Sequence, residues 1–456
     1  MAETVAVILA AGRDTRMHSG VAKALHELGG VPMAEHVVRA VRAAGLGKPW
    51  LVVGYQADRV EETLEGLAQF VVQPEMHGTG DALAQALAAM DTNVDEVVVL
   101  VADSPLVPPS LITQVLEAHH HSGASATIVT TIVSDPAGYG RIIRGEDDSV
   151  RAIVEDKDAM NNPSFYQINE INTGLGVWSV RGLAKILSTL PWHDEERYLT
   201  DAVARLIASG QRVEAYVAPD PVRVMGINTR RDLAHAEAYL RELTLNRLFD
   251  QGVTIVDPAS TFVDVDVEVG QDSIIYPMTF LRGKTRIGRE CHLGPMTSII
   301  SSRLGDGVKV DRSVVEQSAL ASHSSVGPFS HLRPGTSLDH NVKIGNFVEL
   351  KNTRVGTGTK AGHHSYMGDA TIGGGVNIGA GTVIVNFDGK AKHPTFIGDG
   401  AFIGCNVNLV APVEVGPGAY VAAGSTITQN VPPDALAIAR SRQDNKPEWA
   451  RQRRKT

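Results

Sequence analysis

An aliphatic residue recurs at every sixth position in the second half of the chain, and this repeat limits the possible folds more than any other feature. It occupies residues 269–299, 326–350 and 397–427. Neither the ~3.6-residue period of a helix nor the two-residue period of a strand produces this spacing. A β-helix does, because each coil has three flat faces and each face contributes one inward aliphatic side chain. The sequence therefore predicts a solenoid with one continuous core and with flanks that are free to pack against copies of itself.

One interruption of the repeat predicts a loop. Thirteen steps separate Ile384 from Ile397, where the repeat requires twelve. The stretch NFDGKAKH, residues 386–393, is polar and contains a glycine, so it does not continue the aliphatic series. We expect it to leave the coil, and loops on a rigid scaffold often carry binding residues.

The first half has a different pattern, in which short β-branched runs alternate with segments of helical period. The expected strands are residues 5–9, 51–53, 97–101 and 127–133. The expected helices are residues 33–43, 81–90, 109–120 and 199–208. This βαβ alternation predicts an α/β domain with a mainly parallel sheet, which binds ligands beyond the carboxyl ends of its strands.

A helix is expected to join the two halves. It covers residues 229–250 and ends before Gly252, a typical position for a helix-terminating glycine. Four leucines have spacings that fit a single apolar stripe: Leu233, Leu240, Leu243 and Leu248. The predicted parts are thus an α/β domain (1–228), a linker helix (229–250) and a β-helix domain with a C-terminal tail (251–456).

Charge and cysteine content narrow the classes of function. The net charge of −9 disfavours a general nucleic-acid coat, although the run RQRRK near the C-terminus is basic. The two cysteines, Cys291 and Cys405, cannot form a disulfide framework, which favours a reducing compartment. No signal peptide is evident, and no run approaches the ~18 apolar residues of a membrane span. We therefore expect a soluble cytoplasmic protein with no nucleic-acid partner and no membrane span.

The segment LAAGRDTRM, residues 9–17, follows the first expected strand and has the features of an anion-binding loop. Small residues and Gly12 between a strand and a helix expose backbone N–H groups to an anion. Asp14 opposes this field. Its carboxylate should therefore either repel bound phosphates or turn outward and pair with Arg13 or Arg16.

Many short motifs, taken together, are far more specific than any one of them. They are LAAGxxTRM, AKALH, QPEMHGTGDA, ADSPL, GYGRI, EINTG, GINTR, LRPG, GNFVELK, KAGHHSYMGDA, NIGAGT and NFDGK. With these motifs the chain resembles, over essentially its whole length, the bacterial bifunctional N-acetylglucosamine-1-phosphate uridylyltransferases/glucosamine-1-phosphate acetyltransferases. The resemblance implies a Rossmann-like nucleotidyltransferase domain, a linker helix and a left-handed parallel β-helix of hexapeptide repeats that forms a homotrimer.

The resemblance also implies two reactions. Acetyl-CoA acetylates the amine of glucosamine-1-phosphate. The resulting N-acetylglucosamine-1-phosphate then attacks the α-phosphate of UTP and releases pyrophosphate, with Mg²⁺ as cofactor. The product, UDP-N-acetylglucosamine, supplies the synthesis of peptidoglycan and lipopolysaccharide.

In the first domain, two polyanions must be brought together, which requires cations and N–H donors more than an acid or a base. The resemblance implies that Arg16 and Lys23 neutralise the phosphates and that Asp103 and Asn228 hold the magnesium ion, whose preferred ligands are oxygens. The implied phosphate-side and nucleotide contacts are Leu9, Ala10, Ala11, Gly12, Lys23, Val101, Ala102, Asp103 and Asn228. The implied uracil and ribose contacts are Gln73, Gly78 and Thr79, and those of the amino sugar are Gly140, Glu155 and Asn172. A neutral amide such as that of Gln73 is able to offer both a donor and an acceptor to a pyrimidine edge.

In the second domain, an amine becomes nucleophilic only after losing its proton, so a neutral histidine is the natural general base. His363 is the candidate, and Glu349 is expected to orient it or to help bind the amine. Only one of His363 and His364 should line the site, because neighbouring residues of a coil point to different sides. By resemblance, glucosamine-1-phosphate contacts Arg333, Lys351, Tyr366 and Asn377. By the same resemblance, acetyl-CoA contacts Ala380, Asn386, Phe387, Cys405, Ala423 and Arg440. Direct transfer needs no cysteine nucleophile.

Several positions depart from the family pattern. The departures are Asp14 for glycine, Ala22 for proline, Val101 and Ala102 for a Tyr-Gly or similar pair, Phe387 for tyrosine and Cys405 for serine. Those near the phosphate loop bear on uridylyl transfer, and Phe387 removes one hydroxyl near the coenzyme. None of them affects the magnesium ligands, His363 or the phosphate-binding cations.

Two other functions fit parts of the sequence. A sugar nucleotidyltransferase such as an ADP-glucose pyrophosphorylase has a regulatory β-helix, which would not need the stretches KAGHHSYMGD and NFDGK. A non-catalytic trimeric scaffold would tolerate the loss of Asp103 or Lys23, and both are present.

Overall fold

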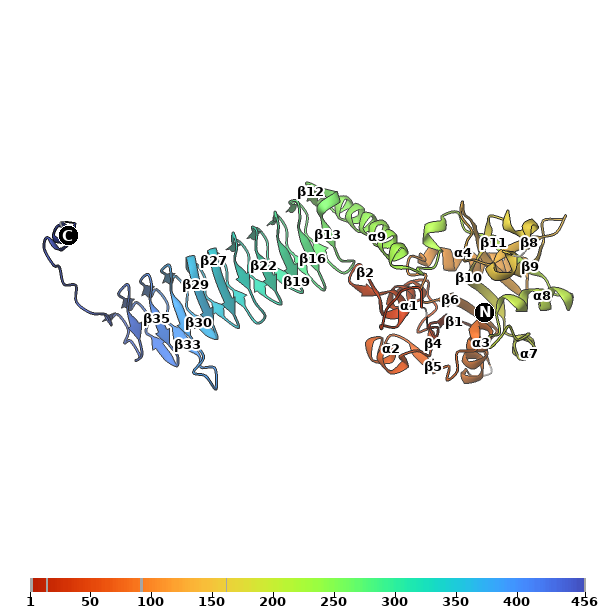
Figure 1. Ribbon diagram of the computed structural model, residues 1–456, viewed down its shortest axis with the longest axis horizontal. Helices are drawn as coiled ribbons and strands as arrows, with labels where there is room; N and C mark the ends of the chain where they lie inside the picture. The colour runs from red at the N-terminus through yellow and green to blue at the C-terminus, as the bar shows by residue number, and fades with distance from the viewer. Residues whose placement is uncertain (1–2, 14, 91–92, 161, 455–456) are drawn as a thin grey trace. The chain divides into compact units, whose positions relative to one another are not determined.

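A computed structural model of the chain describes residues 3–13, 15–90, 93–160 and 162–454. The chain divides into two compact units, Met1–Leu240 and Arg241–Thr456. The division falls inside helix α9 (Arg230–Asp250), so this helix contributes residues to both units (Figure 1).

The first unit is built on a nine-stranded sheet (Figure 1). Its strands are β1 (Thr4–Leu9), β4 (Trp50–Val53), β5 (Gln69–Val72), β6 (Glu96–Val101), β7 (Ala126–Ile132), β8 (Arg141–Arg144), β9 (Val150–Val154), β10 (Glu170–Ser179) and β11 (Val213–Val217). Seven of them follow the order β11-β7-β10-β6-β1-β4-β5, and β8 pairs with β10 and β9. The pairs of β1 with β4 and β6 are parallel, whereas β10 is antiparallel to β6 and β7. The pairs among β1, β4, β5, β6, β7 and β11 are parallel, as predicted, whereas the pairs that involve β8, β9 and β10 are antiparallel.

Helices cover both faces of this sheet. They are α1 (Met33–Ala43), α2 (Ala57–Thr63), α3 (Gly78–Ala89), α4 (Pro109–Ser122), α5 (Asp156–Ala159), α6 (Pro163–Tyr166), α7 (Leu183–Ser188) and α8 (Thr200–Ala208). Alternate residues of β1 enter two apolar clusters. Ala6 and Ile8 pack with residues of α1, α2 and α4, whereas Val7 and Leu9 pack with residues of α3, α7 and α8. All four predicted strands and all four predicted helices of this half lie within three residues of the observed bounds.

Among the described residues, six further short elements belong neither to the nine-stranded sheet nor to the three faces of the second unit. They are β2 (Glu27–Leu28), β3 (Val31–Pro32), the helix α10 (Trp449–Arg453) and the 3-10 turns η1 (Lys23–Leu25), η2 (Pro221–Arg223) and η3 (Pro258–Ser260).

The second unit is a parallel β-helix whose strands cover three faces. The first face holds β12 (Thr254–Ile255), β15 (Ile274–Ile275), β18 (His292–Leu293), β21 (Lys309–Val310), β24 (Ser325–Val326), β31 (Asn377–Ile378), β34 (Phe402–Ile403), β37 (Tyr420–Val421) and β39 (Leu436–Ala437). The second holds β13 (Phe262–Val263), β16 (Phe280–Arg282), β19 (Ser298–Ile300), β22 (Val314–Glu316), β25 (His331–Leu332), β32 (Val383–Val385), β35 (Asn408–Val410) and β38 (Thr426–Ile427). The third holds β14 (Glu268–Val269), β17 (Arg286–Ile287), β20 (Arg303–Leu304), β23 (Ala319–Leu320), β26 (Ser337–Leu338), β28 (Arg354–Val355), β30 (Ala370–Ile372), β33 (Thr395–Ile397) and β36 (Val413–Val415). Two longer strands, β27 (Lys343–Lys351) and β29 (Lys360–Gly368), run through the corner between the first two faces.

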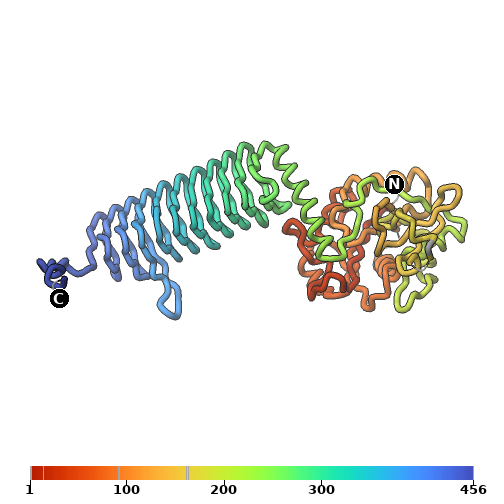
Figure 2. The backbone as a smooth tube through the Cα atoms, turned by 45° about the horizontal axis from the view of Figure 1, so that its top comes forward, coloured from red at the N-terminus to blue at the C-terminus, as the bar shows by residue number. Residues whose placement is uncertain are grey.

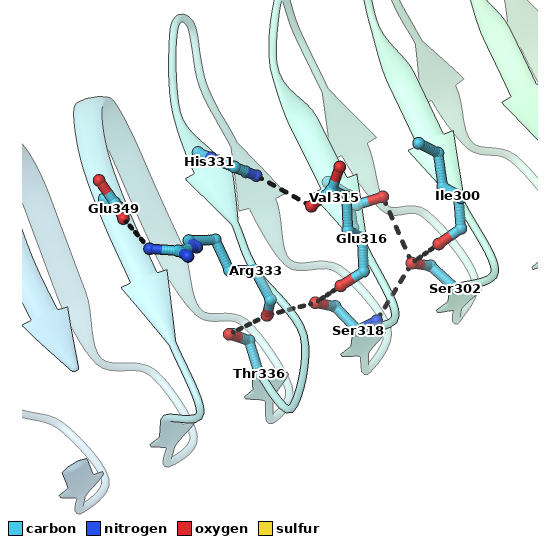
Figure 3. A network of polar contacts seen from close by, with 9 residues as sticks. All are labelled: Ile300, Ser302, Val315, Glu316, Ser318, His331, Arg333, Thr336 and Glu349. Atoms are coloured by element: carbon cyan, nitrogen blue, oxygen red, sulfur yellow. Dashed lines mark hydrogen bonds and ion pairs between the residues drawn. The ribbon is translucent and has the colours of Figure 1, made fainter. Parts of the chain in front are cut away.

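One continuous core fills the solenoid. Every aliphatic residue of the predicted six-residue repeat is buried in a single cluster. Small hydroxyl side chains satisfy backbone groups at a corner: Ser302 Oγ donates to the Ile300 carbonyl at 2.8 Å and accepts from Ser318 N at 3.1 Å (Figure 3). The repeat therefore predicted both the fold and its inward-facing side chains.

The stretch 386–393 leaves the coil as predicted, between β32 and β33, and projects from the blue part of the tube in Figure 2. Asp388 holds this loop together. Its carboxylate accepts from the backbone N–H groups of Lys390 and Ala391, each at 2.7 Å, and lies 2.7 Å from His393 Nε2. These contacts hold the pKa of Asp388 below its usual range.

The expected single stripe on the joining helix is wrong. Leu233 and Leu240 of α9 pack against a small core of the first unit, and Leu248 is buried in the solenoid core. Leu243 lies on the surface and is 36% exposed. Because the two ends of α9 bury their side chains in two different cores, one continuous stripe is not required. Among the described residues, no helix is both long enough and apolar enough to cross a bilayer.

Candidate functional site

An open cavity of about 750 Å³ lies in the first unit and gathers most of the predicted nucleotide contacts. Twelve of them line it: Leu9, Ala10, Ala11, Gly12, Arg16, Lys23, Gln73, Gly78, Thr79, Val101, Ala102 and Asp103. The cavity is lined by the residues at and just after the ends of β1 and β6. Ala102 N donates to the Leu9 carbonyl at 3.0 Å and so holds these two segments together. This is the edge of a parallel sheet at which ligands usually bind.

One polar cluster at this cavity contains two cationic side chains and two side chains whose oxygen atoms accept hydrogen bonds from them. Lys23 Nζ donates to Asp103 Oδ2 at 2.5 Å and to Asn228 Oδ1 at 2.7 Å. Arg16 Nη2 donates to the same Asn228 oxygen at 2.9 Å. The Lys23 side chain is only 11% exposed, so the ammonium group is enclosed by these oxygens. Four of the predicted site residues thus meet in one network, although Asn228 is far from the other three in sequence.

The start of α9 fixes Asn228. Asp232 Oδ2 accepts from Asn228 N at 3.0 Å and from Thr229 N at 2.8 Å, and Asp232 N donates to Thr229 Oγ1 at 3.2 Å. This reciprocal arrangement is a capping box, which satisfies the free N–H groups at a helix start. The motif GINTRRD therefore positions the Asn228 side chain against the cavity residues Arg16 and Lys23 and begins the helix at the same time.

The oxygens of Asp103 and Asn228 fit a magnesium ion. They converge on one cation, the Lys23 ammonium, and a carboxylate with an amide carbonyl is a hard donor pair of the kind that Mg²⁺ prefers. Among the described residues, no group of three or more His, Cys, Asp or Glu side chains is arranged to hold a metal. A two-ligand site matches the habit of Mg²⁺, which usually keeps waters and substrate phosphates as its other ligands.

Gln56, which the sequence did not indicate as a site residue, holds the backbone next to Lys23 in position. Ala22 N donates to Gln56 Oε1 at 2.9 Å, and Gln56 Nε2 donates to the Gly20 carbonyl at 2.8 Å. Proline has no N–H, so the departure to Ala22 supplies the donor of the first bond.

Arg13 stacks 5.2 Å over the Tyr55 ring. Asp14, whose carboxylate was expected to repel phosphates or pair with an arginine, lies outside the described residues.

The three predicted amino-sugar contacts form a second group beside the cavity. Asn172 N donates to the Gly140 carbonyl at 2.8 Å, and a Cβ added to Gly140 would lie 3.7 Å from Glu155 Oε2. Thr200 Oγ1 donates to Glu155 Oε1 at 2.6 Å. Burial raises the pKa of Glu155. None of the three lines the cavity itself, although Lys157, two residues after Glu155, does.

In the β-helix, the candidate base and three predicted coenzyme contacts occupy one corner. Strand register aligns Ile344, Ala361, Ile378, Ile403 and Val421 on successive coils. The residue two positions after each of them forms what we call the corner column: Asn346, His363, Ala380, Cys405 and Ala423. Arg440 lies at the end of this corner, where its Cδ is 3.6 Å from a Cβ added to Gly424.

The structure corrects the expected partner of His363. His363 Nδ1 lies 2.7 Å from Asn346 Oδ1, one coil earlier, so Asn346 orients the imidazole. Glu349 instead accepts from Arg333 Nη1 at 2.9 Å, as Figure 3 shows, and is in register with Tyr366. The spacing of 17 residues, one coil, between Asn346 and His363 is the sequence signal that could have found this pair.

Three cations, Arg333, Lys351 and Lys392, lie in the same part of the β-helix as Glu349. The neighbouring ammonium of Lys392, together with Arg333, lowers the pKa of Lys351. A cluster of cations of this kind attracts an anion such as a phosphate. Lys392 lies in the loop that interrupts the repeat, and sequence analysis did not name it.

Tyr366 and Asn386 meet at Gly368. A Cβ at that position would lie 2.5 Å from the Tyr366 hydroxyl and 2.6 Å from Asn386 Nδ2, so any other residue there would displace these side chains. Asn386 Nδ2 also donates to Asp369 Oδ2 at 2.6 Å. Phe387, the next residue, is 55% exposed.

Asn377 lies apart from Tyr366 within one chain. It pairs with Lys360 and Phe402 on the first face of the coil, whereas Tyr366 pairs with Val383 on the second. Of the two adjacent histidines, His364 turns the corner with a φ of 38°, and its carbonyl accepts from Gly381 N at 2.7 Å. Cys405 is a free, exposed thiol, whereas Cys291 is buried.

Comparison with known proteins identifies both units. Residues 6–160 match the MobA-like NTP transferase domain family, and residues 394–429 match the bacterial transferase hexapeptide family with six repeats. The first unit is thus a nucleotide-transfer domain, and the second carries the hexapeptide repeats of bacterial transferases.

Relatives span the whole chain. The bifunctional protein GlmU of Acetivibrio thermocellus is 46% identical over 447 residues, which cover 98% of this chain and 96% of the relative. Those of Brevibacillus brevis and Shouchella clausii are each 44% identical; they cover 99% of this chain and 98% and 99% of the relatives, respectively. The chain belongs to the family of the bifunctional protein GlmU.

Proposed function

We propose that the chain catalyses acetylation of glucosamine-1-phosphate by acetyl-CoA, followed by uridylyl transfer from UTP to the N-acetylglucosamine-1-phosphate formed. The observation that carries this proposal is the presence of two separate constellations in one GlmU-family chain. The first is the network of Lys23, Arg16, Asp103 and Asn228, and the second is the pair Asn346–His363 on a β-helix that also carries a group of cations. The first suits phosphoryl chemistry, and the second suits acyl transfer to an amine.

In uridylyl transfer, an oxygen of the sugar phosphate attacks the α-phosphate of UTP and pyrophosphate leaves. Lys23 and Arg16 neutralise the charge of the two polyanions, and the backbone around Gly12 offers N–H donors. Asp103 and Asn228 would hold Mg²⁺, which, when bound, would offset the charge of the phosphates. Lys23 lies next to the same two oxygens and donates to phosphate oxygens of the substrate.

The remaining contacts orient the substrates of this half. Gln73, Gly78 and Thr79 hold the uracil and ribose. Gly140, Glu155 and Asn172 hold the amino sugar, and the half-buried Glu155 carboxylate accepts hydrogen bonds from sugar donors.

In acetyl transfer, the amine of glucosamine-1-phosphate attacks the thioester carbon of acetyl-CoA, and the coenzyme thiolate leaves. With Asn346 Oδ1 accepting from Nδ1–H, the His363 Nε2 atom keeps its lone pair and takes a proton from the amine. Arg333 and Lys351, joined by Lys392, bind the sugar phosphate, and Glu349 helps to bind the amine. The other sugar contacts are Tyr366 and Asn377, and the coenzyme contacts are Ala380, Asn386, Phe387, Cys405, Ala423 and Arg440.

We further propose that the β-helix assembles as a homotrimer. Exposed apolar side chains mark the corner next to the corner column: Met278, Met296, Phe329 and Phe347, each more than half exposed. Phe329 and Phe347 stack with centroids 5.5 Å apart. Exposed apolar side chains in such a series support contact with another chain, and neighbouring subunits would then complete each acetyl site. Light scattering is expected to give three times the chain mass, and an active monomer in the acetyl assay would contradict the proposal.

The same proposal places the enzyme in the cytoplasm, where its soluble substrates are found and where its free thiols stay reduced. The test of function is a coupled assay with glucosamine-1-phosphate, acetyl-CoA, UTP and Mg²⁺. We expect UDP-N-acetylglucosamine, free coenzyme thiol and pyrophosphate as products. Pyrophosphate release without acetylation would indicate a nucleotidyltransferase with a regulatory β-helix, and the absence of both would indicate a scaffold.

A further inference from the structure

We infer that Asp81 fixes the orientation of the Gln73 carboxamide and thereby selects the pyrimidine base that the first site accepts. This inference rests on the proposed use of UTP and names a specificity-determining contact of that site. Gln73 directly follows β5, is only 3% exposed and lines the cavity. Asp81 lies in the first turn of α3.

The partners of Gln73 determine which end of its amide is nitrogen. One end lies 2.7 Å from Asp81 Oδ2 and 3.2 Å from the Gly78 carbonyl. A carboxylate and a backbone carbonyl only accept hydrogen bonds, so the group between them must be the NH₂. This removes the usual ambiguity between the oxygen and the nitrogen of a side-chain amide. Both N–H bonds of Gln73 are therefore used within the protein.

The remaining polar atom, Gln73 Oε1, is left for a ligand. In the part of the chain that the structure describes, no hydrogen bond to Oε1 is formed, and Oε1 is not among the fully buried unpaired atoms. Gln73 thus offers the cavity an acceptor and no donor, which narrows the sequence-based expectation that the amide offers both. Uracil presents N3–H, a donor, whereas the N3 of cytosine is an acceptor. The fixed amide matches uracil and opposes cytosine.

The segment after α7 keeps this arrangement rigid. Gly80 N donates to the Arg197 carbonyl at 2.9 Å, and Arg197 N donates to the His77 carbonyl at 2.8 Å. Leu199 N donates to Thr79 Oγ1 at 3.0 Å. The start of α3, which carries the Gly78 carbonyl, is therefore held on both sides of that residue, and this carbonyl stays in place as an acceptor for the Gln73 amide.

The test compares Asp81→Asn with the matched control Asp58→Asn in the full-length protein. Asp58 is exposed and lies in the first turn of α2, so the control removes the same charge near a helix start without touching Gln73. The readout is kcat/KM for pyrophosphate release with UTP, CTP and N3-methyl-UTP. Asparagine can donate as well as accept, so it permits the flipped amide. We expect the CTP-to-UTP ratio to rise roughly tenfold in Asp81→Asn, the effect of weakening one charge-assisted hydrogen bond. The ratio should stay unchanged in Asp58→Asn.

N3-methyl-UTP and the acetyl-transfer assay distinguish failure of this inference from failure of the proposed function and from misfolding of the variant. N3-methyl-UTP lacks the donor and should be a poor substrate of the wild type. Equal losses with UTP and CTP in Asp81→Asn, or efficient use of N3-methyl-UTP by the wild type, would overturn the inference while leaving uridylyl transfer intact. A wild type inactive with UTP would overturn both the inference and the proposed function. Acetyl transfer reports folding, and Asp81→Ser replaces Asp81→Asn if the latter does not fold.

Discussion

The two candidate sites of this chain are assembled by different means. In the first unit, Lys23 and Asn228 are 205 residues apart and meet through side-chain hydrogen bonds between loops. In the second, Asn346 and His363 are one coil apart and meet because the backbone register repeats. A site of the first kind depends on a few particular contacts, whereas a site of the second kind is positioned by the whole solenoid. Because the two sites are assembled separately, a substitution in one site should leave the activity of the other site unchanged.

The largest effect is expected for Asp103→Ala. It removes the proposed magnesium ligand and the carboxylate to which Lys23 Nζ donates. Magnesium-dependent release of pyrophosphate should be abolished, while acetyl transfer stays intact. Asp58→Ala on the exposed surface of α2 is the control. An unchanged magnesium requirement in Asp103→Ala would show that the ion binds elsewhere.

The mirror experiment is His363→Ala in the second unit. Loss of a general base should reduce acetyl transfer by about 10²–10⁴-fold and leave uridylyl transfer at the wild-type rate. His364→Asn is the control, because asparagine tolerates the positive φ of 38° at that position. Near-normal acetylation by His363→Ala would remove this residue from the mechanism.

A smaller effect is expected at Asn346, which orients His363. Asn346→Ala should lower kcat of acetyl transfer by roughly tenfold with little change in KM, as for lost orientation of a base. In Asn346→Asp, a carboxylate next to the imidazole favours its protonated form. The acidic limb of the pH–rate profile should then move to higher pH. A profile identical to that of the wild type would show that Asn346 has only a structural role.

The smallest effect concerns stability in the first unit. Burial raises the pKa of Glu155, so the folded protein binds this proton more tightly than the unfolded chain does. The resulting stabilisation is complete below the unfolded pKa, about 4.3, and is lost as pH rises through the folded pKa. Glu155→Gln stays neutral, so its melting temperature should fall less between about pH 4 and about pH 7 than that of the wild type. The exposed Glu62→Gln should follow the wild type, and parallel curves for Glu155→Gln would contradict the account.

The sequence predicted the second region better than the first, for a physical reason. The six-residue repeat is local, so it located the buried aliphatic positions and the loop at 386–393. The grouping of Asp103 with Asn228 depends on tertiary folding and came only from the family resemblance, and the contact of Lys23 with both was not predicted. Gln56 and Asn346 were missed because their roles are visible only through their partners. Leu243 was misplaced because spacing alone does not show that the two ends of α9 enter different cores.

If each region performs one complete reaction, the N-acetylated intermediate passes between the two regions through solution. Neither Asp103→Ala nor His363→Ala should make UDP-N-acetylglucosamine from glucosamine-1-phosphate, acetyl-CoA, UTP and Mg²⁺. A mixture of the two proteins should restore its formation, because one variant supplies the N-acetylated sugar phosphate that the other consumes. A mixture as inactive as the separate variants would contradict the account.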